Sequence, residues 1–128
     1  MKLAKTITFI ALSAVLSIAS AGEIKPFNQQ DFDKLTHEGK SVVLGISATW
    51  CPTCKAQKPI LDGLMKQPAY KDVTLMTIDF DSAKPTLKTF KVAMQSTLIA
   101  FKGDREVGRS VGDTTSSGIE SLVKKALN

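Results

Sequence analysis

The chain has 128 residues, of which 43% are hydrophobic, 23% charged and 6% aromatic, and its formal charge is +5. This composition is typical of one globular domain with a packed core, and it excludes a large multidomain enzyme as well as collagen-like and disordered chains. Basic and acidic residues are mixed along the chain, with no basic run beyond Lys124-Lys125. We interpret the charge as solvated surface and expect no nucleic-acid partner.

The first 21 residues have the pattern of a secretory signal peptide. Lys2 and Lys5 precede an apolar run over residues 7–19, and Ala19-Ser20-Ala21 supplies the small residues that a signal peptidase requires. An uncleaved membrane anchor is the alternative, but the uncharged stretch is shorter than the ~20 apolar residues of a spanning helix. We expect cleavage after Ala21, export to an oxidising compartment and a mature domain over residues 22–128. Its formal charge falls to +3, because 15 of the 17 basic residues remain against 12 acidic residues.

The first elements of the mature chain are a helix and a buried strand. Asn28 is placed to cap a helix that carries Phe32 and Leu35 on one face and stops at Gly39. Residues 41–48 then form a short, nearly continuous apolar run rich in β-branched residues. This run predicts a central strand buried on both faces.

The middle of the chain predicts a second helix, a second strand and a short helix. Pro52 suits the first turn of a helix, and Pro59 should kink that helix. Apolar residues recur beyond it at helical spacing. Residues 73–80 have the apolar, β-branched pattern of a buried strand, and residues 85–92 predict a short helix leading out of it.

The last third predicts a β-hairpin and a closing helix. Residues 97–101 and 106–111 predict two strands of a hairpin, joined by a turn at Lys102-Gly103-Asp104. Thr114 or Thr115 can cap a final helix whose apolar stripe is Ile119, Leu122, Val123 and Ala126. The order β-α-β-α, then a hairpin and a C-terminal helix, predicts an α/β fold with a mixed sheet flanked by helices.

The chain has two cysteines, Cys51 and Cys54, at the junction of the first strand and the second helix. Backbone N–H groups and the dipole at the start of a helix stabilise a thiolate, so we expect Cys51 to be the nucleophile. Cys54 lies at i+3 on the same face, close enough to resolve a mixed disulfide. Lys55 and Lys58 either add positive charge near the cysteines or are simply solvated lysines on the helix surface. A metal half-site shared between chains and an inert bridge are the alternatives to thiol chemistry.

The register around the cysteines resembles that of the thioredoxin superfamily over roughly residues 27–127. The matching segments are Ala48-Thr49-Trp50-Cys51, Cys54-Lys55, Pro59-Ile60-Leu61, Thr97 to Gly103, and Val111-Gly112. With its signal peptide the chain is similar to the small exported thioredoxin-like proteins of bacterial periplasms. The resemblance implies thiol–disulfide exchange on other proteins, with the first cysteine attacking and the second resolving.

The resemblance also implies where a protein substrate binds. An extended peptide would pair with a backbone edge beside the cysteines. The residues implied in substrate contact are Trp50, Pro52, Thr53, Gln95, Ser96, Thr97 and Gly112. His37 is interpreted as an exposed residue at a helix end, not as a catalytic base.

The first departure from the family pattern is Ser96, which stands where thioredoxins have a cis-proline. A non-proline cis bond costs ~2.5–4 kcal/mol, so we expect a trans Gln95–Ser96 bond or a strained loop held by its surroundings. Without the proline ring we expect the cysteine sulfurs to be less shielded. A soft metal could then reach them.

The second departure is Gly45, which stands where thioredoxins bury an acidic residue beneath the second cysteine. Gly45 cannot carry a proton, so the base that assists Cys54 must be water or another group. Asp79 on the neighbouring strand is one candidate. Capping a loop at the strand end is its alternative role.

These features predict an exported, monomeric thiol:disulfide oxidoreductase that reduces protein disulfides and contributes to redox homeostasis outside the cytoplasm. No nicotinamide or flavin site fits the pattern, so the electrons would come from a transmembrane thiol carrier. The short segment between Cys54 and Ser96 leaves no room for an inserted helical domain, which favours a reductant over a disulfide-donating oxidant. The remaining alternative is a module that binds a client or a metal without turnover.

Overall fold

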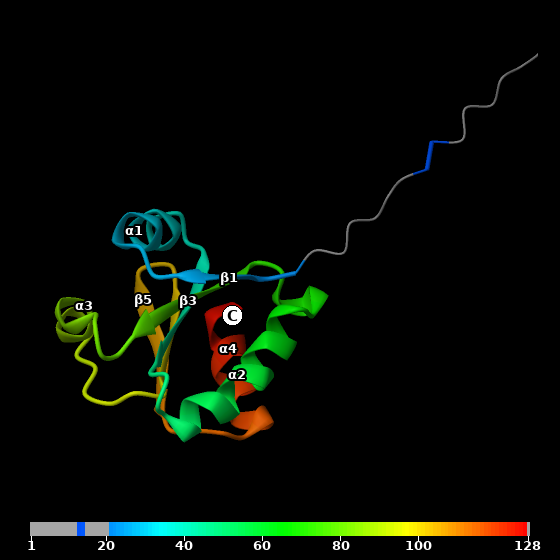
Figure 1. The fold of residues 1–128 in the computed structure, drawn as a ribbon. Helices are drawn as coiled ribbons and strands as arrows, with labels where there is room; N and C mark the ends of the chain where they lie inside the picture. Colours follow the sequence, from blue (N-terminus) through cyan, green and yellow to red (C-terminus); the bar gives the residue numbers. More distant parts are fainter. Residues whose placement is uncertain (1–12, 15–20, 128) are drawn as a thin grey trace, which may run out of the picture.

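The computed structural model describes residues 13–14 and 21–127, so the predicted signal peptide lies almost entirely outside the described residues (Figure 1). No helix among the described residues is long and apolar enough to cross a membrane. In chain order the elements are β1 (Glu23–Pro26), α1 (Gln29–His37), β2 (Ser41–Ser47), α2 (Pro52–Met65), the 3₁₀ helix η1 (Pro68–Tyr70), β3 (Val73–Asp79), α3 (Lys84–Thr89), β4 (Thr97–Lys102), β5 (Arg105–Val111) and α4 (Ser116–Leu127).

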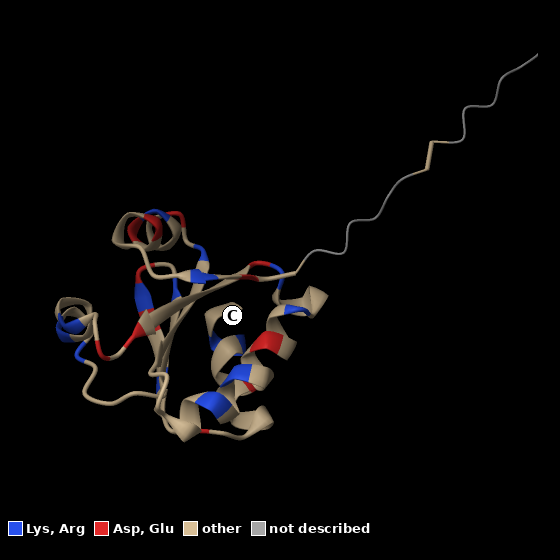
Figure 2. Cartoon of the chain, viewed as in Figure 1, with Lys and Arg blue, Asp and Glu red and all other residues tan. Residues whose placement is uncertain are grey.

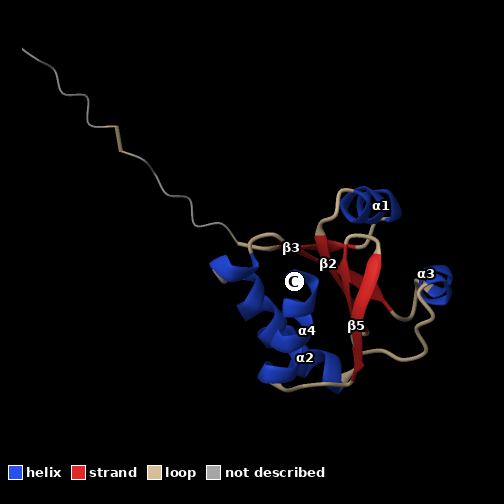
Figure 3. Ribbon diagram, turned by 180° about the vertical axis from the view of Figure 1, so that it is seen from behind, coloured by secondary structure: helices blue, strands red, loops and turns tan. Residues whose placement is uncertain are grey.

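The strands of the described chain form one five-stranded mixed sheet in the order β1-β3-β2-β4-β5. β3 runs parallel to both β1 and β2, whereas β4 is antiparallel to β2 and to β5. The views from opposite sides show α1 and α3 on one face of the sheet and α2 and α4 on the other (Figures 1 and 3). The predicted α/β fold with a mixed, helix-flanked sheet is confirmed.

Side-chain alternation along the central strand creates two cores. In β2, Val43 packs with the apolar stripes of α2 and α4. Its neighbours Val42 and Leu44 point to the opposite face and pack with Phe32 of α1 and Leu87 of α3. Because both faces of β2 are covered, its sequence is the nearly continuous apolar run from which a central strand was predicted.

The predicted helix starts are found where the capping residues indicated. Asn28 Oδ1 accepts a hydrogen bond from the N–H of Asp31 at 3.1 Å and opens α1. Before α4, Thr115 Oγ1 accepts from the N–H of Gly118 at 3.2 Å. In α2, the helix continues through Pro59 to Met65. Local side-chain chemistry therefore sets where these helices begin.

The edge strand β1 was not predicted. It has only four residues, Glu23–Pro26, and two of them are charged. It pairs parallel to β3, with Ile24 beside Leu75. A short, exposed strand of this kind has no apolar periodicity of its own, so only its pairing with β3 defines it.

Basic and acidic residues alternate along the described part of the chain. Basic and acidic positions are mixed on α1 and on α2 (Figure 2). Lys58, for example, pairs with Asp62 at 2.7 Å one turn along α2. This distribution agrees with the interpretation of the charge as solvated surface.

Candidate active site

Cys51 and Cys54 lie where β2 ends and α2 begins, and they form a disulfide with a Cα–Cα separation of 5.3 Å. Cys51 is the N-cap of α2, and its Sγ accepts a hydrogen bond from the N–H of Cys54 at 3.2 Å. Pro52 fills the next position, where the missing N–H costs no helix hydrogen bond. The same N–H group and helix dipole would stabilise a Cys51 thiolate after reduction.

The two cysteines are well shielded from solvent. Cys51 is 1% exposed and Cys54 7% exposed, and both pack against Ala48 and Phe80. The expectation that the cysteine sulfurs are less shielded than beside a proline ring stays a prediction, although both residues are buried here. No group of three or more His, Cys, Asp or Glu side chains is placed to hold a metal within the described part of the chain.

The Ser96 loop faces the disulfide in a strained backbone conformation. The Gln95–Ser96 bond is trans, and Ser96 has a φ of +56°, in the left-handed region. The Ser96 N–H donates to Ile46 O at 2.8 Å, its hydroxyl donates to Gln95 O at 2.6 Å, and its carbonyl accepts from the N–H of Gly112 at 3.0 Å. Left-handed backbone at a residue other than glycine costs on the order of 1–3 kcal/mol, which these hydrogen bonds offset.

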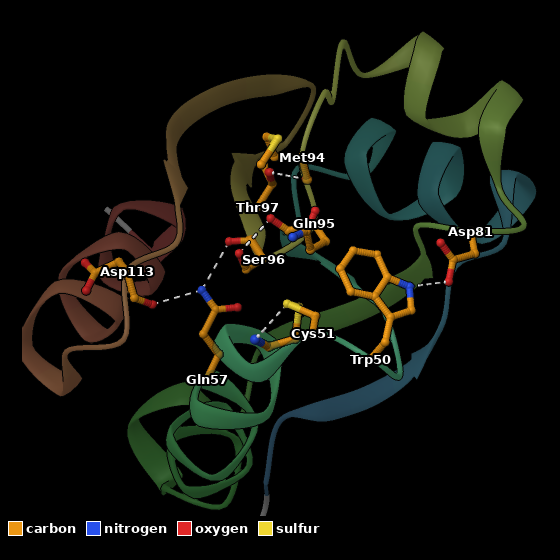
Figure 4. The surroundings of a disulfide bond; sticks show 10 residues. Trp50, Cys51, Gln57, Asp81, Met94, Gln95, Ser96, Thr97 and Asp113 are labelled. Atoms are coloured by element: carbon orange, nitrogen blue, oxygen red, sulfur yellow. Dashed lines mark hydrogen bonds between the residues drawn. A yellow bond between two sulfur atoms is a disulfide. The ribbon is translucent and has the colours of Figure 1, made fainter.

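The side chain of Gln57 also holds the Ser96 loop, and the sequence did not reveal this role. Gln57 lies on α2, is only 3% exposed, and its Nε2 donates to Ser96 O at 3.2 Å and to Asp113 O at 2.9 Å (Figure 4). The available signal was a polar residue on the apolar face of α2, at i+3 from Cys54 and i−4 from Leu61. A buried amide in such a stripe needs partners from elsewhere in the fold.

A cavity of about 450 Å³ lies beside Gly45, between α2 and the sheet. Gly45 is buried, and a Cβ added there would meet only Leu75 and Leu98, at ordinary contact distances of 3.5 and 3.7 Å. The cavity is mostly apolar and reaches Cys54 and Gln57. The site therefore has open space where the family pattern has a buried acid.

Asp79 does not supply the missing acid beneath Cys54. It stands exposed at the end of β3, and its carboxylate accepts a hydrogen bond from the Ser82 hydroxyl at 2.6 Å. This bond lowers the pKa of Asp79, together with backbone N–H groups of the following turn and the charge of Lys84. Asp79 caps the turn after β3 and does not line the cavity.

Three large apolar side chains are exposed next to the cysteines in sequence or on the segments that flank Ser96 and Gly112. Trp50 is 55% exposed, and its Nε1 donates to Asp81 at 2.8 Å (Figure 4). Met94 and Val111 are 52% and 57% exposed, and neither was predicted as a contact residue. Large apolar side chains left in water around a reactive pair are typical of a surface that binds another protein.

The residues implied in substrate contact differ in accessibility. Pro52 and Gly112 are exposed, and Thr53 and Gln95 are half-buried. Ser96 and Thr97 are buried, and the hydroxyl of Thr97 donates to Met94 O at 2.7 Å. The polar groups of Ser96 and of the Thr97 side chain bond within the protein, so Gln95 is the more accessible residue of this edge. His37 is exposed at the end of α1.

A mixed sheet covered on both faces, with a shielded disulfide capping the helix that follows its central strand, defines the class of dithiol–disulfide exchange proteins. The model of the thioredoxin family matches residues 23–125. The chain belongs to the thioredoxin family and is a thiol:disulfide oxidoreductase.

Individual relatives agree with this assignment. Thioredoxin of Coprinus comatus is 28% identical over 100 residues, which cover 78% of this chain and 93% of the relative. Thioredoxin of Chlamydia muridarum is 34% identical over 84 residues, covering 66% and 80%. The crystal structure of Trxlp from Edwardsiella tarda EIB202 superimposes with a TM-score of 0.77 at 35% identity, covering 79% of this chain and 98% of that one.

Proposed function

We propose that the protein reduces disulfide bonds of other proteins in the periplasm, as a monomer that is recharged by a transmembrane thiol donor. The observation that carries the exchange chemistry is the position of Cys51, whose Sγ caps α2 and accepts the N–H of Cys54. A sulfur held in this way is stabilised as a thiolate, which is the attacking species in exchange.

The cycle uses both cysteines and needs no cofactor. The Cys51 thiolate attacks one sulfur of a client disulfide, forms a mixed disulfide and releases the other client sulfur as a thiolate. Cys54 loses its proton and attacks the Cys51 sulfur, which releases the client as a dithiol and leaves the Cys51–Cys54 disulfide. Two electrons pass to the client, so a dithiol donor must reduce the protein before the next cycle.

Two features support a reductant outside the cytoplasm. The first 21 residues have the charge, length and small-residue pattern of a cleaved export signal. Between Cys54 and Ser96 the chain contains only the rest of α2, then η1, β3 and α3, which gives no separate domain of the kind expected in an exported oxidant. Cell fractionation followed by determination of the N-terminal residue tests the location, with a mature protein that starts at Gly22 as the expected result.

The reduction potential tests the direction of exchange. We would equilibrate residues 22–128 in glutathione or dithiothreitol buffers and follow the fluorescence of Trp50, the single tryptophan. A value near the ~−270 mV of thioredoxin supports a reductant, whereas a value near ~−120 mV would identify a disulfide donor. A protein without a reversible two-electron transition would be a binding module instead. In that case a Cys54→Ala variant would also fail to trap clients on Cys51.

A further inference from the structure

The Gln57 side chain is deeply buried, and its amide oxygen faces the cavity without a hydrogen-bond donor from the described protein. Its Nε2 is bound to two carbonyl oxygens, of Ser96 and Asp113, on the loops before β4 and after β5. If the amide were flipped, Oε1 would face both carbonyl oxygens, and two acceptors cannot form a hydrogen bond. The two hydrogen bonds therefore assign the positions of Nε2 and Oε1. Among the described residues no donor is paired with Gln57 Oε1, and the atom is not fully enclosed, so it borders the open space of the cavity.

The fixed amide directs its oxygen to the side of the cysteines. Gln57 follows Cys54 by one helical turn, on the buried face of α2. Figure 4 shows the Gln57 oxygen on the side that faces the disulfide, with the nitrogen turned away toward Ser96 and Asp113. Gln57 and Cys54 border the same cavity.

The cavity offers Cys54 no other buried polar side chain. The cavity is also lined by Gly45, by the apolar side chains of Leu61, Leu75 and Leu98, and by the exposed residues Ser47, Thr49 and Thr77. The titratable groups that line it, Lys55, Lys58 and Asp62, all lie on α2, where both lysines are exposed and Asp62 pairs with Lys58. None of the lining residues from β1, β2, β3 or β4 is titratable. Gln57 is therefore the one buried polar side chain that borders the cavity together with Cys54.

We propose that Gln57 is a positioning residue for the exchange reaction: tethered by the Ser96 and Asp113 carbonyls, it accepts on Oε1 the S–H hydrogen bond of Cys54 in the reduced protein. An acceptor for the thiol favours its protonated form. Cys54 then stays neutral while Cys51, at the helix N-cap, carries the negative charge and attacks. Because an amide takes up no proton, the Cys54 proton passes to water when Cys54 resolves the mixed disulfide.

The test isolates the Cys54 thiol in a Cys51→Ser background. The sequence has only two cysteines, so the remaining thiolate absorbance in an ultraviolet pH titration belongs to Cys54. Gln57→Leu and Gln57→Met each remove the acceptor at similar volume. We expect both to lower the pKa of Cys54 by about half a unit to one unit.

Two further variants separate this role from a general effect on folding. Gln57→Glu keeps acceptor oxygens on the side chain but loses both Nε2 hydrogen bonds, and its negative charge beside the thiol should raise the pKa of Cys54 above that of the protein with Gln57. Leu64→Ala loosens the buried face of the same helix without touching Cys54 and should leave the titration unchanged. If the Leu and Met variants leave the pKa unchanged or raise it, burial alone governs Cys54 and the proposal is wrong.

This inference deepens the proposed exchange cycle and rests on it, but the two fail in different ways. The Cys54 titration needs no client, donor or turnover. The direction of exchange is decided by the reduction potential of the protein with both cysteines present. If the Gln57 variants lower the pKa of Cys54 as expected but the reduction potential is that of an oxidant, the role of Gln57 stands and the proposed direction of exchange is wrong.

Discussion

The two faces of the sheet are packed differently, and the difference separates stability from chemistry. On the α1 and α3 face, Phe27, Phe32, Phe90 and Phe101 pack with ring centroids 5.2–5.9 Å apart. On the α2 and α4 face, a cavity of about 450 Å³ extends from Gly45 to Cys54. Aromatic pairs gain energy beyond the area that they bury, whereas side chains that line a cavity open to solvent have no packing partners on that side. We call the α1 and α3 side of the sheet the aromatic face and the α2 and α4 side the looser face. The comparison teaches that the aromatic face supports the fold and that the looser face contains the reactive pair.

The largest effect is expected at the reactive pair. Cys51→Ser removes the nucleophile, so reduction of a disulfide-containing protein by dithiothreitol in the presence of this variant should show no acceleration over the uncatalysed rate. A three-residue spacing closes a small loop, so the lost disulfide should change the free energy of unfolding far less than the loss of a core aromatic. Circular dichroism with urea titration checks the second point, and a strongly destabilised variant would contradict the separation of the two roles.

On the aromatic face the expected pattern is the opposite. Phe32→Ala removes the ring that contacts Phe27, Phe90 and Phe101. The expected loss is about 3–5 kcal/mol of unfolding free energy, measured by urea titration. The reduction potential should stay within a few millivolts, since the ring lies across the sheet from Cys54. A large shift of the potential would show that the faces are coupled.

The α2 and α4 face also has a titratable contact. Tyr70 is buried, and its hydroxyl donates to Glu120 at 2.6 Å. Burial, followed by the hydrogen bond and the charge of Glu120, raises the pKa of Tyr70 to about 12. The neutral phenol is thus favoured in the folded state, and its contribution to stability is complete below pH 10.

Stability should therefore fall as the pH rises through the window from 10 to 12. The expected loss from this group is on the order of 2 kcal/mol, seen as a lower urea midpoint. Tyr70→Phe removes the titrating group, so the same pH change should cost that variant less. Equal losses in both proteins would show that Tyr70 does not govern this part of the pH profile.

Whether a feature of this structure can be predicted from the sequence depends on how far apart in the chain the contacting residues lie. The caps at Asn28 and Thr115 and the position of Cys51 before Pro52 follow from neighbouring residues, and each could be predicted. The bonds from Gln57 to Asp113 and from Trp50 to Asp81 join residues 56 and 31 positions apart. No local pattern encodes such pairs, because they arise only when two loops meet in the folded chain. The same holds for β1, which only β3 defines.

Ser96 offers a matched pair of substitutions at the border of the looser face. Both Ser96→Gly and Ser96→Ala remove the hydroxyl, but only glycine adopts a φ of +56° without strain. The glycine variant should be more stable than the alanine variant by about 1 kcal/mol, measured by thermal unfolding of the oxidised protein. Equal stability would indicate that the loop changes conformation when the hydroxyl is lost.

The smallest effect is expected at Gly45, where the cavity itself is altered. A Cβ at this position meets Leu75 and Leu98 at 3.5 and 3.7 Å, so Gly45→Ala fits without displacement. Alanine also loses less backbone entropy than glycine in a strand, and the expected gain is about 0.5–1 kcal/mol. Gly108→Ala is the matched control in β5, because its Cβ would lie 2.7 Å from Leu122 and should destabilise the protein. If Gly45→Ala gains stability while the reduction potential is unchanged, the looser packing at this site is not needed for the redox chemistry. A shifted potential would instead tie the space beneath Cys54 to the reaction.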